Sequence, residues 1–474
     1  MTSLKFGTSG LRGLVTELTD SICFAYVTAF LKHMKGHHGT PENSLVLIGY
    51  DLRASSPRIT AAAIAAVQAS GMQAENCGPL PTPALALRAL SSKVPAIMIT
   101  GSHIPDDRNG LKFYRPDGEI DKADEAGIIA QLDLAGAQLP KNMPDLPIAP
   151  DASQEYINRC THLLDTFALK GKRIGIYQHS SVARDVLDNV LTATGATTLP
   201  LGRSDIFIPV DTEALRPEDV VLAEQAAREF SFDALVSTDG DADRPLIADE
   251  NGTYMRGDNV GLLTAHFLGA DAVVTPVTSN TAIELSGFFK KVYRTRVGSP
   301  FVIAGMQQAI SDGYTRVIGF EANGGVLLGS TIDMDGRTIA ALPTRDAMLP
   351  ILSILGMAAK NGTKVSELLN GLPSRFTRSG RLEHISSDLS GPFLQSLLSA
   401  EKCQSFFAPI GTVEESDSID GTRVVLAGGD VIHYRASGNA PELRCYAEAS
   451  SDVRAMELLD WGLNQAQEAM QKQT

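Results

Sequence analysis

The chain has 474 residues, of which 43% are hydrophobic and 20% charged, and its formal net charge is -14. A chain of this length exceeds what one hydrophobic core organises, so we expect two to four domains. The acidic balance argues against nucleic acid or an anionic membrane surface as the main partner, because both select for basic surfaces.

The five cysteines are scattered along the chain and form no Cys-x-x-Cys pair. This pattern indicates a reducing compartment and argues against a disulfide framework or structural zinc. The first residues lack a basic region followed by an apolar core, so no signal peptide is expected. The longest uncharged run, Ala347 to Ala359, is too short to span a bilayer and predicts a buried helix. We therefore expect a cytoplasmic protein with no membrane partner.

Three segments of the chain repeat one pattern: an apolar strand, a short polar loop and an alanine- or leucine-rich helix. The strands are predicted at 44–50, 172–177 and 271–277, with helices at 58–70, up to 194 and up to 289. Alternation of this kind builds mainly parallel sheets with right-handed crossovers. We therefore predict three α/β domains in succession.

The pattern changes near Pro373. Two predicted strands, 422–427 and 431–435, flank Gly428-Gly429, which is a hairpin signal. A strand at 443–449 and an amphipathic helix at 452–471 follow. This order predicts a smaller α+β domain with a mainly antiparallel sheet.

Turn-forming residues gather at 139–150, 251–258 and 371–379, where we place the domain boundaries. The predicted limits are 1–148 (domain I), 149–255 (domain II), 256–372 (domain III) and 373–474 (domain IV).

The stretch Ile99 to Lys112 follows a short apolar strand and brings Ser102 and His103 together in one loop. Open α/β sheets place their ligands at the carboxyl ends of strands, which is where this loop begins. Ser102 could therefore be a nucleophile or a phosphate carrier. The alternative interpretation is an ordinary surface turn.

The segment 238–244 is the sharpest local signal. Its carboxylates Asp239, Asp241 and Asp243 alternate with small residues, which suits a hard divalent cation such as magnesium. A calcium EF-hand loop is the rival interpretation, because Glu250 is twelfth in the count from Asp239. That loop requires glycine at its sixth position, where this chain has Arg244, and the flanking segments predict strands. We therefore predict a magnesium site that polarises a phosphoryl oxygen.

Three further segments carry weaker signals. Segment 5–13 is rich in glycine and hydroxyl groups and holds Arg12, so it could wrap an anion. Segment 435–444 offers two arginines, a serine and an asparagine to a phosphate. The carboxylate and amide of segment 321–325 suit sugar hydroxyls. Each of the three could also be an ordinary turn.

Taken together and in this order, these segments resemble the α-D-phosphohexomutase family, the phosphomannomutases and phosphoglucomutases. The resemblance covers nearly the whole chain, with one motif in each of the four domains and a fifth at the N-terminus. It implies an isomerase that interconverts hexose 1-phosphate and hexose 6-phosphate through a phosphoserine and a hexose 1,6-bisphosphate. The implied fold is three similar mixed-sheet α/β domains and a smaller α+β domain around a central cleft.

The resemblance also assigns roles to individual residues. The predicted catalytic residues are Ser102, which carries the phosphoryl group, Lys112 and Arg12 beside it, and His103 in support. The predicted Mg²⁺ ligands are Ser102, Asp239, Asp241 and Asp243. The predicted substrate-binding residues are Arg244, Glu321, Asn323, Arg435, Ser437, Gly438, Asn439 and Arg444.

The chain departs from the family pattern in three places. The sugar segment ends in Gly324-Gly325 where the family usually has Gly-His, and Gly298-Ser299 also lacks the usual histidine. Asn439-Ala440 stands where Thr-Glu is usual. We therefore expect Lys112 to carry more of the proton transfer alone.

Phosphomannomutase activity, accompanied by phosphoglucomutase activity, is the first expectation. Phosphoglucosamine mutase is the close alternative, and a non-catalytic sugar-phosphate-binding regulatory protein is the alternative from another class. The expected partners are small hexose phosphates, and the expected assembly is a monomer or a homodimer.

Overall fold

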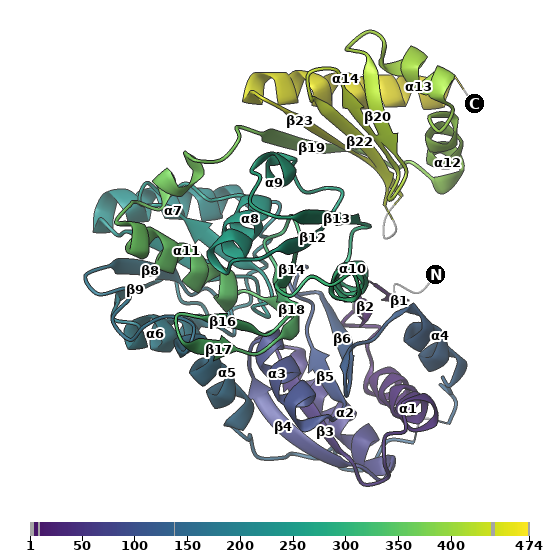
Figure 1. The fold of residues 1–474 in the computed structure, drawn as a ribbon. Coiled ribbons are helices and arrows are strands. Elements are labelled where there is room, and N and C mark those ends of the chain that lie inside the picture. The colour runs from purple at the N-terminus through teal and green to yellow at the C-terminus, as the bar shows by residue number, and fades with distance from the viewer. Residues whose placement is uncertain (1–3, 8–9, 137, 438–440, 473–474) are drawn as a thin grey trace.

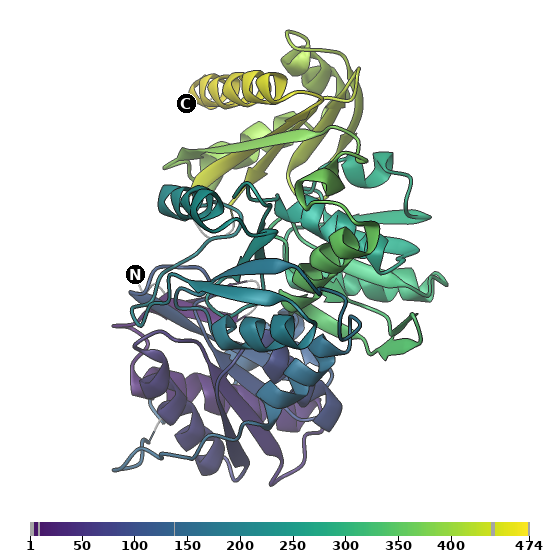
Figure 2. The same cartoon turned by 90° about the vertical axis from the view of Figure 1, so that its left-hand side faces the viewer.

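The computed structural model describes residues 4–7, 10–136, 138–437 and 441–472. Domain I and domain IV lie at opposite ends of the molecule, and domains II and III lie between them (Figures 1 and 2). Each predicted domain range contains one main sheet, as the expected fold requires. The exact limits between the ranges stay predictions.

Domain I is built on a seven-stranded mixed sheet, with the order β1-β2-β6-β5-β3-β4 and β7 beside β6. The strand pairs β3–β4 and β3–β5 are parallel, and the others are antiparallel. The predicted helix at 58–70 begins two residues earlier, because proline is well accepted in the first turn of a helix. The elements are β1 (Lys5–Phe6), β2 (Gly10–Leu14), α1 (Asp20–His37), β3 (Leu45–Tyr50), α2 (Ser56–Ala69), β4 (Gln73–Pro79), α3 (Thr82–Ser92), β5 (Ala96–Ile99), β6 (Arg108–Arg115), β7 (Gly118–Glu119) and α4 (Lys122–Ala130).

Domain II contains a four-stranded sheet in the order β11-β10-β8-β9. Strand β8 pairs in parallel with both β10 and β9, whereas β11 is antiparallel to β10. The strands predicted on both sides of the aspartate triplet are therefore confirmed, and the EF-hand alternative is excluded. The elements are α5 (Asp151–Thr161), β8 (Arg173–Tyr177), α6 (Arg184–Ala193), β9 (Thr197–Leu201), α7 (Pro217–Phe230), β10 (Ala234–Thr238) and β11 (Pro245–Ala248).

Domain III has a five-stranded mixed sheet in the order β13-β12-β14-β15-β18 and a separate β16–β17 hairpin. The buried helix predicted at 347–359 is confirmed as α11. The elements are α8 (Gly257–Phe267), β12 (Ala272–Pro276), α9 (Ala282–Leu285), β13 (Lys291–Thr295), α10 (Ser299–Ser311), β14 (Val317–Phe320), β15 (Val326–Leu328), β16 (Ile332–Met334), β17 (Arg337–Ile339), β18 (Leu342–Asp346), α11 (Met348–Asn361) and the 3₁₀ helix η1 (Ser366–Leu369).

The helix predicted to run up to residue 289 is wrong, because α9 is a single turn. Gly287 follows it with a φ of 67°, which turns the chain out of the helix. The carbonyls of the preceding loop are satisfied by the Arg294 guanidinium, which donates to the carbonyls of Pro276, Ser279 and Asn280. The crossover between β12 and β13 is therefore mostly loop.

Domain IV has a fully antiparallel sheet in the order β19-β23-β22-β21-β20, as predicted for an α+β domain. The hairpin predicted around Gly428 and Gly429 is confirmed, and both glycines have positive φ angles, as tight hairpin turns require. The elements are β19 (Phe376–Glu383), α12 (Ser387–Ser396), α13 (Ala400–Phe407), β20 (Val413–Asp417), β21 (Thr422–Leu426), β22 (Val431–Ala436), β23 (Glu442–Ala449) and α14 (Asp452–Gln471).

Four of the five segments singled out for their chemistry each connect two neighbouring strands of one sheet. The serine segment joins β5 to β6, the aspartate segment joins β10 to β11, and the sugar segment joins β14 to β15. The phosphate segment joins β22 to β23. All four strand pairs are antiparallel neighbours. Each of these segments therefore follows the end of one strand and precedes its antiparallel neighbour.

The buried apolar side chains connect domains I, II and III but leave domain IV with a cluster of its own. One cluster of buried side chains runs through domains I, II and III, from Leu47 through Tyr156 and Ile174 to Met348. Domain IV has a cluster of its own, which includes Phe393, and α14 covers one face of its sheet in Figure 1. The first three domains are therefore bound together by shared apolar packing, and domain IV is a separately packed unit.

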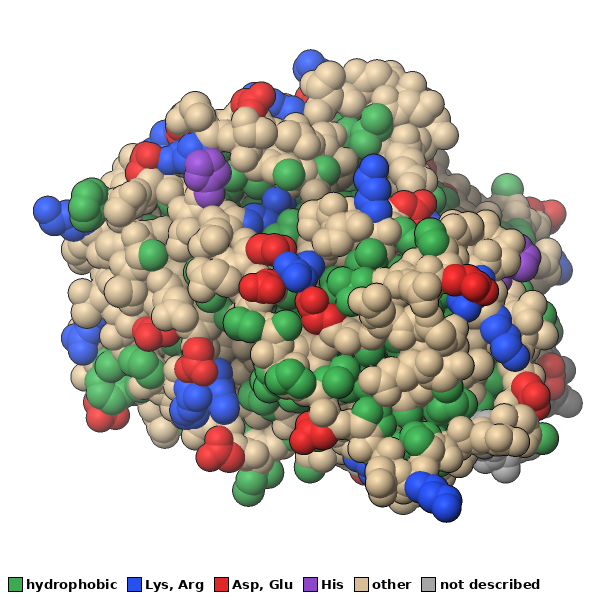
Figure 3. All heavy atoms as spheres, turned by 90° about the horizontal axis from the view of Figure 1, so that it is seen from below, with side chains coloured by type: hydrophobic (Ala, Val, Ile, Leu, Met, Phe, Trp, Pro, Cys, Tyr) green, Lys and Arg blue, Asp and Glu red, His purple; other side chains and the backbone are tan. Residues whose placement is uncertain are grey.

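The surface agrees with the acidic composition. On the face shown in Figure 3, basic side chains are interspersed with acidic ones, and no continuous basic stripe is visible there. Within the part of the chain that the structure describes, no helix combines the length and apolar character needed to cross a membrane.

Candidate active site

Two buried residues of the loop after β3, Asp51 and Arg53, hold the loop that carries Ser102 in place. Asp51 accepts hydrogen bonds from the Thr100 hydroxyl at 2.7 Å and from the Gly101 N–H at 3.2 Å. Arg53 is 1% exposed and bonds to Asp51 at 3.0 Å. Its guanidinium also donates to four carbonyls of the serine loop, those of Ser102, Ile104, Pro105 and Arg108. These contacts bind the whole loop to the sheet.

Ser102 itself is fully buried and has a φ of 55°, which is uncommon for a residue other than glycine. Strained backbone of this kind persists where surrounding contacts enforce it, and it clusters at functional sites. Its hydroxyl donates to Asp239 Oδ2 at 2.6 Å and lies 3.2 Å from His103 Nδ1. The structure therefore brings the serine loop of domain I against the aspartate loop of domain II.

The two loops approach closely at Gly240. A Cβ atom on this residue would lie 2.9 Å from the Ser102 carbonyl oxygen and equally close to the Phe207 ring. No side chain can be accommodated at that distance without a shift of the backbone. The glycine between the first two aspartates is therefore needed for contact between the loops.

Lys112 lies on β6 and reaches into the aspartate loop. Its Nζ donates to Asp241 Oδ2 at 2.6 Å and to Asp243 Oδ2 at 2.8 Å. The Thr82 hydroxyl also donates to Asp241 Oδ2 at 2.6 Å. One oxygen of each carboxylate is therefore occupied by fixed donors.

The three aspartates together could hold a cation. Asp239, Asp241 and Asp243 each offer a carboxylate oxygen, and these atoms lie within 4.8 Å of one another. The Oδ1 atoms of Asp241 and Asp243 are buried and accept no hydrogen bond. A buried carboxylate oxygen without a donor is costly, and a divalent metal would satisfy it.

The carboxylates of the triplet differ in their pKa values. Burial and the neighbouring Asp241 and Asp243 carboxylates hold the pKa of Asp239 well above its ordinary value. Burial opposes ionisation of Asp243 as well, but Arg345, Lys112 and Arg244 outweigh it, and its pKa lies well below the ordinary value. Burial alone would lower the pKa of Lys112, but the two carboxylates raise it. The lysine is therefore an ammonium group at neutral pH and can donate a proton.

Arg345 on β18 joins the aspartate loop to the sugar loop, and the sequence analysis missed it. Its Nη2 lies 2.8 Å from Asp243 Oδ2, and its Nη1 lies 2.9 Å from Glu321 Oε2. The side chain is 4% exposed, so a full charge is buried between two carboxylates. The residues on either side of Arg345 form no recognisable sequence motif. Its role depends on Asp243 and Glu321, which lie on two loops that are distant in sequence.

Arg53 and Asp51 were also missed. Their segment was predicted only as the polar loop after the first strand. The sequence did hold one indication of their role: an aspartate and an arginine directly after a buried strand, at the carboxyl end where open α/β sheets bind ligands.

Arg12 and His103 lie beside the same charges. Burial, followed by the nearby cations Arg244 and Arg345, lowers the pKa of Arg12 to about 10. Burial, followed by Arg244 and Arg12, lowers the pKa of His103 to about 2. The imidazole is therefore neutral in the unphosphorylated protein and is a poor general base, which suits a supporting role.

The predicted sugar loop is tightly packed. Glu321 is 3% exposed, and one of its oxygens is paired with Arg345. The Asn323 side chain accepts a hydrogen bond from the Gly325 N–H at 2.9 Å, and its carbonyl accepts one from the Thr212 hydroxyl at 2.7 Å. Domain II thus holds the sugar loop of domain III in place.

The two arginines of the phosphate loop are more exposed than the residues around Ser102. Arg435 and Arg444 face each other across β22 and β23, and they pair with Asp420 and Glu442 at 2.7 and 2.8 Å. Arg444 also lines a cavity of about 380 Å³ between domains II and IV, together with Glu213. The Ser437 N–H donates to the Glu442 carbonyl at 3.0 Å. Gly438 and Asn439, which were predicted to bind substrate, lie outside the described residues.

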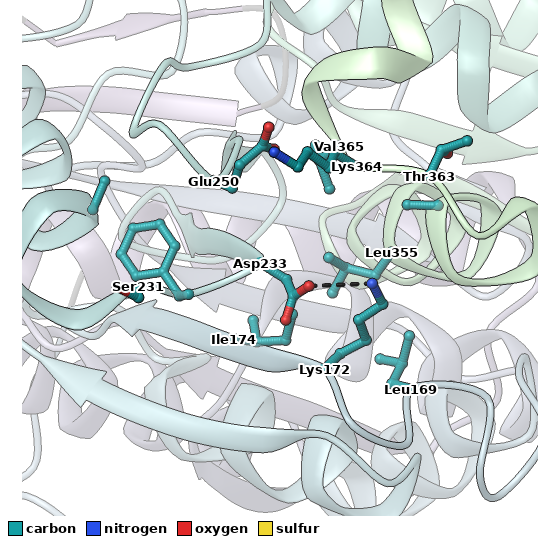
Figure 4. Close-up of a pocket in the computed structure, with 13 residues that line it drawn as sticks. Leu169, Lys172, Ile174, Ser231, Asp233, Glu250, Leu355, Thr363, Lys364 and Val365 are labelled. Atoms are coloured by element: carbon teal, nitrogen blue, oxygen red, sulfur yellow. Dashed lines mark hydrogen bonds and ion pairs between the residues drawn. The ribbon is translucent and has the colours of Figure 1, made fainter.

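A second cavity, of about 350 Å³, lies between domains II and III (Figure 4). Its polar lining includes the ion pair of Lys172 with Asp233 at 3.1 Å. These two residues precede the amino ends of β8 and β10, whereas Asp239 follows the carboxyl end of β10. The cavity therefore belongs to the edge of the sheet opposite the aspartate loop.

The buried serine, the cationic lysine and the carboxylates with unbonded oxygens suit phosphoryl transfer, which depends on positioning and charge neutralisation. Four phosphoglucomutase/phosphomannomutase family models match the chain: alpha/beta/alpha domain I at 3–137, alpha/beta/alpha domain II at 154–252, alpha/beta/alpha domain III at 256–376 and the C-terminal domain at 398–460.

Relatives and solved structures match over nearly the whole length. A phosphomannomutase of Sinorhizobium fredii is 48% identical, and the match covers 97% of this chain and 98% of that protein. A phosphomannomutase of Salmonella muenchen is 46% identical over 96% and 94% of the two chains. A crystal structure of a phosphoglucomutase/phosphomannomutase family protein from Burkholderia thailandensis superposes with a TM-score of 0.78 at 20% identity and covers 98% and 97%.

The chain belongs to the phosphoglucomutase/phosphomannomutase family, which are phosphohexomutases. A relative named phosphoglucosamine mutase, from Granulibacter bethesdensis, is 28% identical. The family predicted from the sequence and its four-domain fold are therefore confirmed, and the phosphoglucosamine mutases are the more distant branch.

Proposed function

We propose that the protein is a phosphomannomutase that interconverts mannose 1-phosphate and mannose 6-phosphate, and that also accepts the glucose phosphates. The observation that carries the proposal is the 2.6 Å contact between the Ser102 hydroxyl and Asp239, beside two carboxylates with unbonded oxygens. The names of the relatives at 46 and 48% identity support mannose as the first sugar.

In the proposed cycle, Ser102 carries a phosphoryl group. The bond between its Oγ and phosphorus breaks as the free hydroxyl oxygen of the hexose monophosphate bonds to phosphorus. Lys112 is suited to donate a proton to Ser102 Oγ as that bond breaks and, once neutral, to take up the proton that the sugar hydroxyl loses, so that its own charge is restored. The resulting hexose 1,6-bisphosphate turns over in the cleft and returns its other phosphoryl group to Ser102.

We propose Mg²⁺ as the metal, held by Asp239, Asp241 and Asp243 together with an oxygen of the phosphoserine. An all-oxygen ligand set is what magnesium prefers. When bound, the metal would neutralise phosphoryl charge. Arg12, which lies near His103 and the aspartate loop, adds positive charge, so that an incoming hydroxyl oxygen can approach a group with close to two negative charges.

The remaining predicted residues would hold the sugar and its second phosphate. Glu321 and Asn323 lie on a loop fixed by domain II, which supports a role in orienting hydroxyl groups. Arg435 and Arg444 stand side by side on two strands, which supports a grip on the phosphate that is not transferred. Arg244, Ser437, Gly438 and Asn439 complete the proposed set.

The test is a comparison of turnover with the 1-phosphates of mannose, glucose and glucosamine, with Mg²⁺ and a trace of hexose 1,6-bisphosphate. We expect mannose 1-phosphate to be converted fastest and chelation by EDTA to stop the reaction until Mg²⁺ is restored. A preference for glucosamine 1-phosphate would contradict the assignment of the sugar. No turnover of any of the three would favour the non-catalytic alternative.

The proposal also covers the compartment and the oligomeric state of the enzyme. The five cysteines are free and buried, which supports the cytoplasm as its compartment. We propose a monomer or a homodimer, and light scattering of the purified protein would distinguish the two.

A further inference from the structure

A second cluster of metal-ligating side chains lies in domain I, where α1 ends against the start of α4. His33 Nε2 lies 3.0 Å from Asp124 Oδ1, and His38 Nε2 lies 2.7 Å from the same oxygen. The three ligand atoms lie within 4.8 Å of one another. Two imidazole nitrogens and one carboxylate oxygen therefore converge on one point.

The backbone of α4 is shaped to receive the His33 ring. A Cβ atom at Gly127 would lie 2.2 Å from His33 Cε1 and 2.4 Å from its Nδ1. The ring can lie against this helix only because residue 127 has no side chain. His33 is 4% exposed, and its Nδ1 is buried without a hydrogen-bond partner. The imidazole is thus held in place by packing, with its Nε2 directed at Asp124.

The carboxylate is held by its other oxygen. Asp124 Oδ2 accepts hydrogen bonds from Arg115 at 2.9 Å and from the Asp121 N–H at 3.0 Å. Metal-ligating carboxylates are oriented by outer hydrogen bonds of this kind. Only Oδ1 of Asp124 is therefore directed toward the two histidines.

The chemistry of this cluster differs from that of the aspartate triplet. Imidazole nitrogen suits zinc and similar transition metals, whereas magnesium prefers oxygen alone. Tetrahedral zinc at about 2.0–2.1 Å from each ligand places the ligand atoms about 3.3 Å apart. The observed separations of 3.0 and 2.7 Å would need to widen by only a few tenths of an ångström.

We propose that His33, His38 and Asp124 bind a divalent transition metal of the zinc type. The fourth position is left to solvent on the side of His38, whose side chain is 26% exposed. The metal joins the end of α1 to the start of α4, and so braces domain I at a site separate from the serine and aspartate loops.

The experiment measures Zn²⁺ bound to the full-length protein in the presence of excess Mg²⁺, by titration calorimetry and by metal analysis after gel filtration. We expect one equivalent of Zn²⁺ in the parent protein and its loss in Asp124→Asn and in His38→Ala. His37 is the matched control, because its ring stacks on His33 at 4.4 Å but is not one of the three ligands. His37→Ala should keep the equivalent of Zn²⁺.

Two further readouts keep the proposal open to refutation. Asp241→Asn should also keep the equivalent, because that residue belongs to the aspartate loop. His38→Ala replaces a partly exposed side chain, so it should fold, retain mutase turnover and lose the rise in melting temperature that Zn²⁺ gives the parent. Equal Zn²⁺ binding by the parent and His38→Ala, or no binding by the parent, would leave the cluster as a hydrogen-bonded triad and overturn the proposal.

Discussion

The two sides of the proposed active site are built differently. The reactive side consists of the serine loop and the aspartate loop, in which Ser102 and the three aspartates are buried. The gripping side includes Arg435 on β22 and Arg444 on β23, and the side chain of Arg444 is 39% exposed. The reactive side belongs to a core shared by three domains, and the gripping side belongs to a domain with its own core.

Polar contacts, rather than a continuous core, join the gripping side to the rest. Asp420 accepts a hydrogen bond from the Val297 N–H at 3.1 Å, and the Ile419 carbonyl accepts one from Arg296 at 3.0 Å. The Glu448 carboxylate accepts another from the Thr281 N–H at 3.0 Å. Phosphoryl transfer needs fixed geometry, whereas a bisphosphate that turns over needs a grip that can open.

Of the substitutions on the reactive side, Ser102→Ala should have the largest effect. The variant has no oxygen to carry the phosphoryl group, so we expect turnover to fall by more than about 10⁴-fold. The measurement is conversion of mannose 1-phosphate, together with mass spectrometry of the peptide that contains Ser102. Full activity of the variant would remove Ser102 from the mechanism, and an active preparation without phosphate on that peptide would argue against a phosphoserine.

Lys112→Met tests the proton donor. Loss of a well-placed acid or base typically costs roughly 10²- to 10⁴-fold in rate, and we expect a loss in that range in kcat. Burial opposes the charge of Lys112, but Asp241 and Asp243 raise its pKa above the ordinary value, so its ion pairs stabilise the fold at neutral pH and are lost as pH rises through that raised pKa. A parent-like kcat at pH 7.5 would show that another group donates the proton.

Arg345→Met tests the bridge between the aspartate and sugar loops. Removing one member of a buried ion pair leaves charges unpaired, so we expect a loss of roughly 3 kcal/mol in unfolding free energy and a lower kcat. Arg345→Lys is the matched control, because it keeps the charge but cannot reach both carboxylates in the same way. If both variants match the parent in melting temperature and kcat, the bridge contributes to neither stability nor turnover.

Arg444→Met should have the smallest effect, and it should change KM and not stability. A charge-assisted hydrogen bond to phosphate contributes about 1.5–3 kcal/mol, so we expect KM to rise by roughly 10- to 100-fold. The melting temperature should stay close to that of the parent, because the side chain is partly exposed. A large loss of stability would show that this side of the site is as rigid as the reactive side.

Much of the fold could be predicted from the sequence. The strands of residues 44–50 and 172–177 and the closing helix of residues 452–471 follow apolar periodicity, which burial and backbone geometry impose locally. The prediction of a helix up to residue 289 was wrong, because the Arg294 guanidinium, which lies beyond the segment, bonds to the carbonyls of the loop that precedes α9. Tertiary contacts therefore overrode the local pattern.

The candidate site divides in the same way. Ser102 and the three aspartates could be chosen because each lies in a short motif, and the structure brings Ser102 into contact with Asp239, beside Asp241 and Asp243. Arg53 and Arg345 could not, because their roles depend on carbonyls and carboxylates that only folding places around them. The roles of all these residues in turnover stay predictions that the variants above test.

The position of these segments between antiparallel neighbours has a consequence for how such an enzyme can diversify. The strands that flank the sugar loop pair from Phe320 with Val326, so the segment 321–325 can be exchanged without changing the register of the sheet. On the roles proposed above, exchange of this segment would change which sugar is held, while the aspartate segment would keep the chemistry common to all substrates.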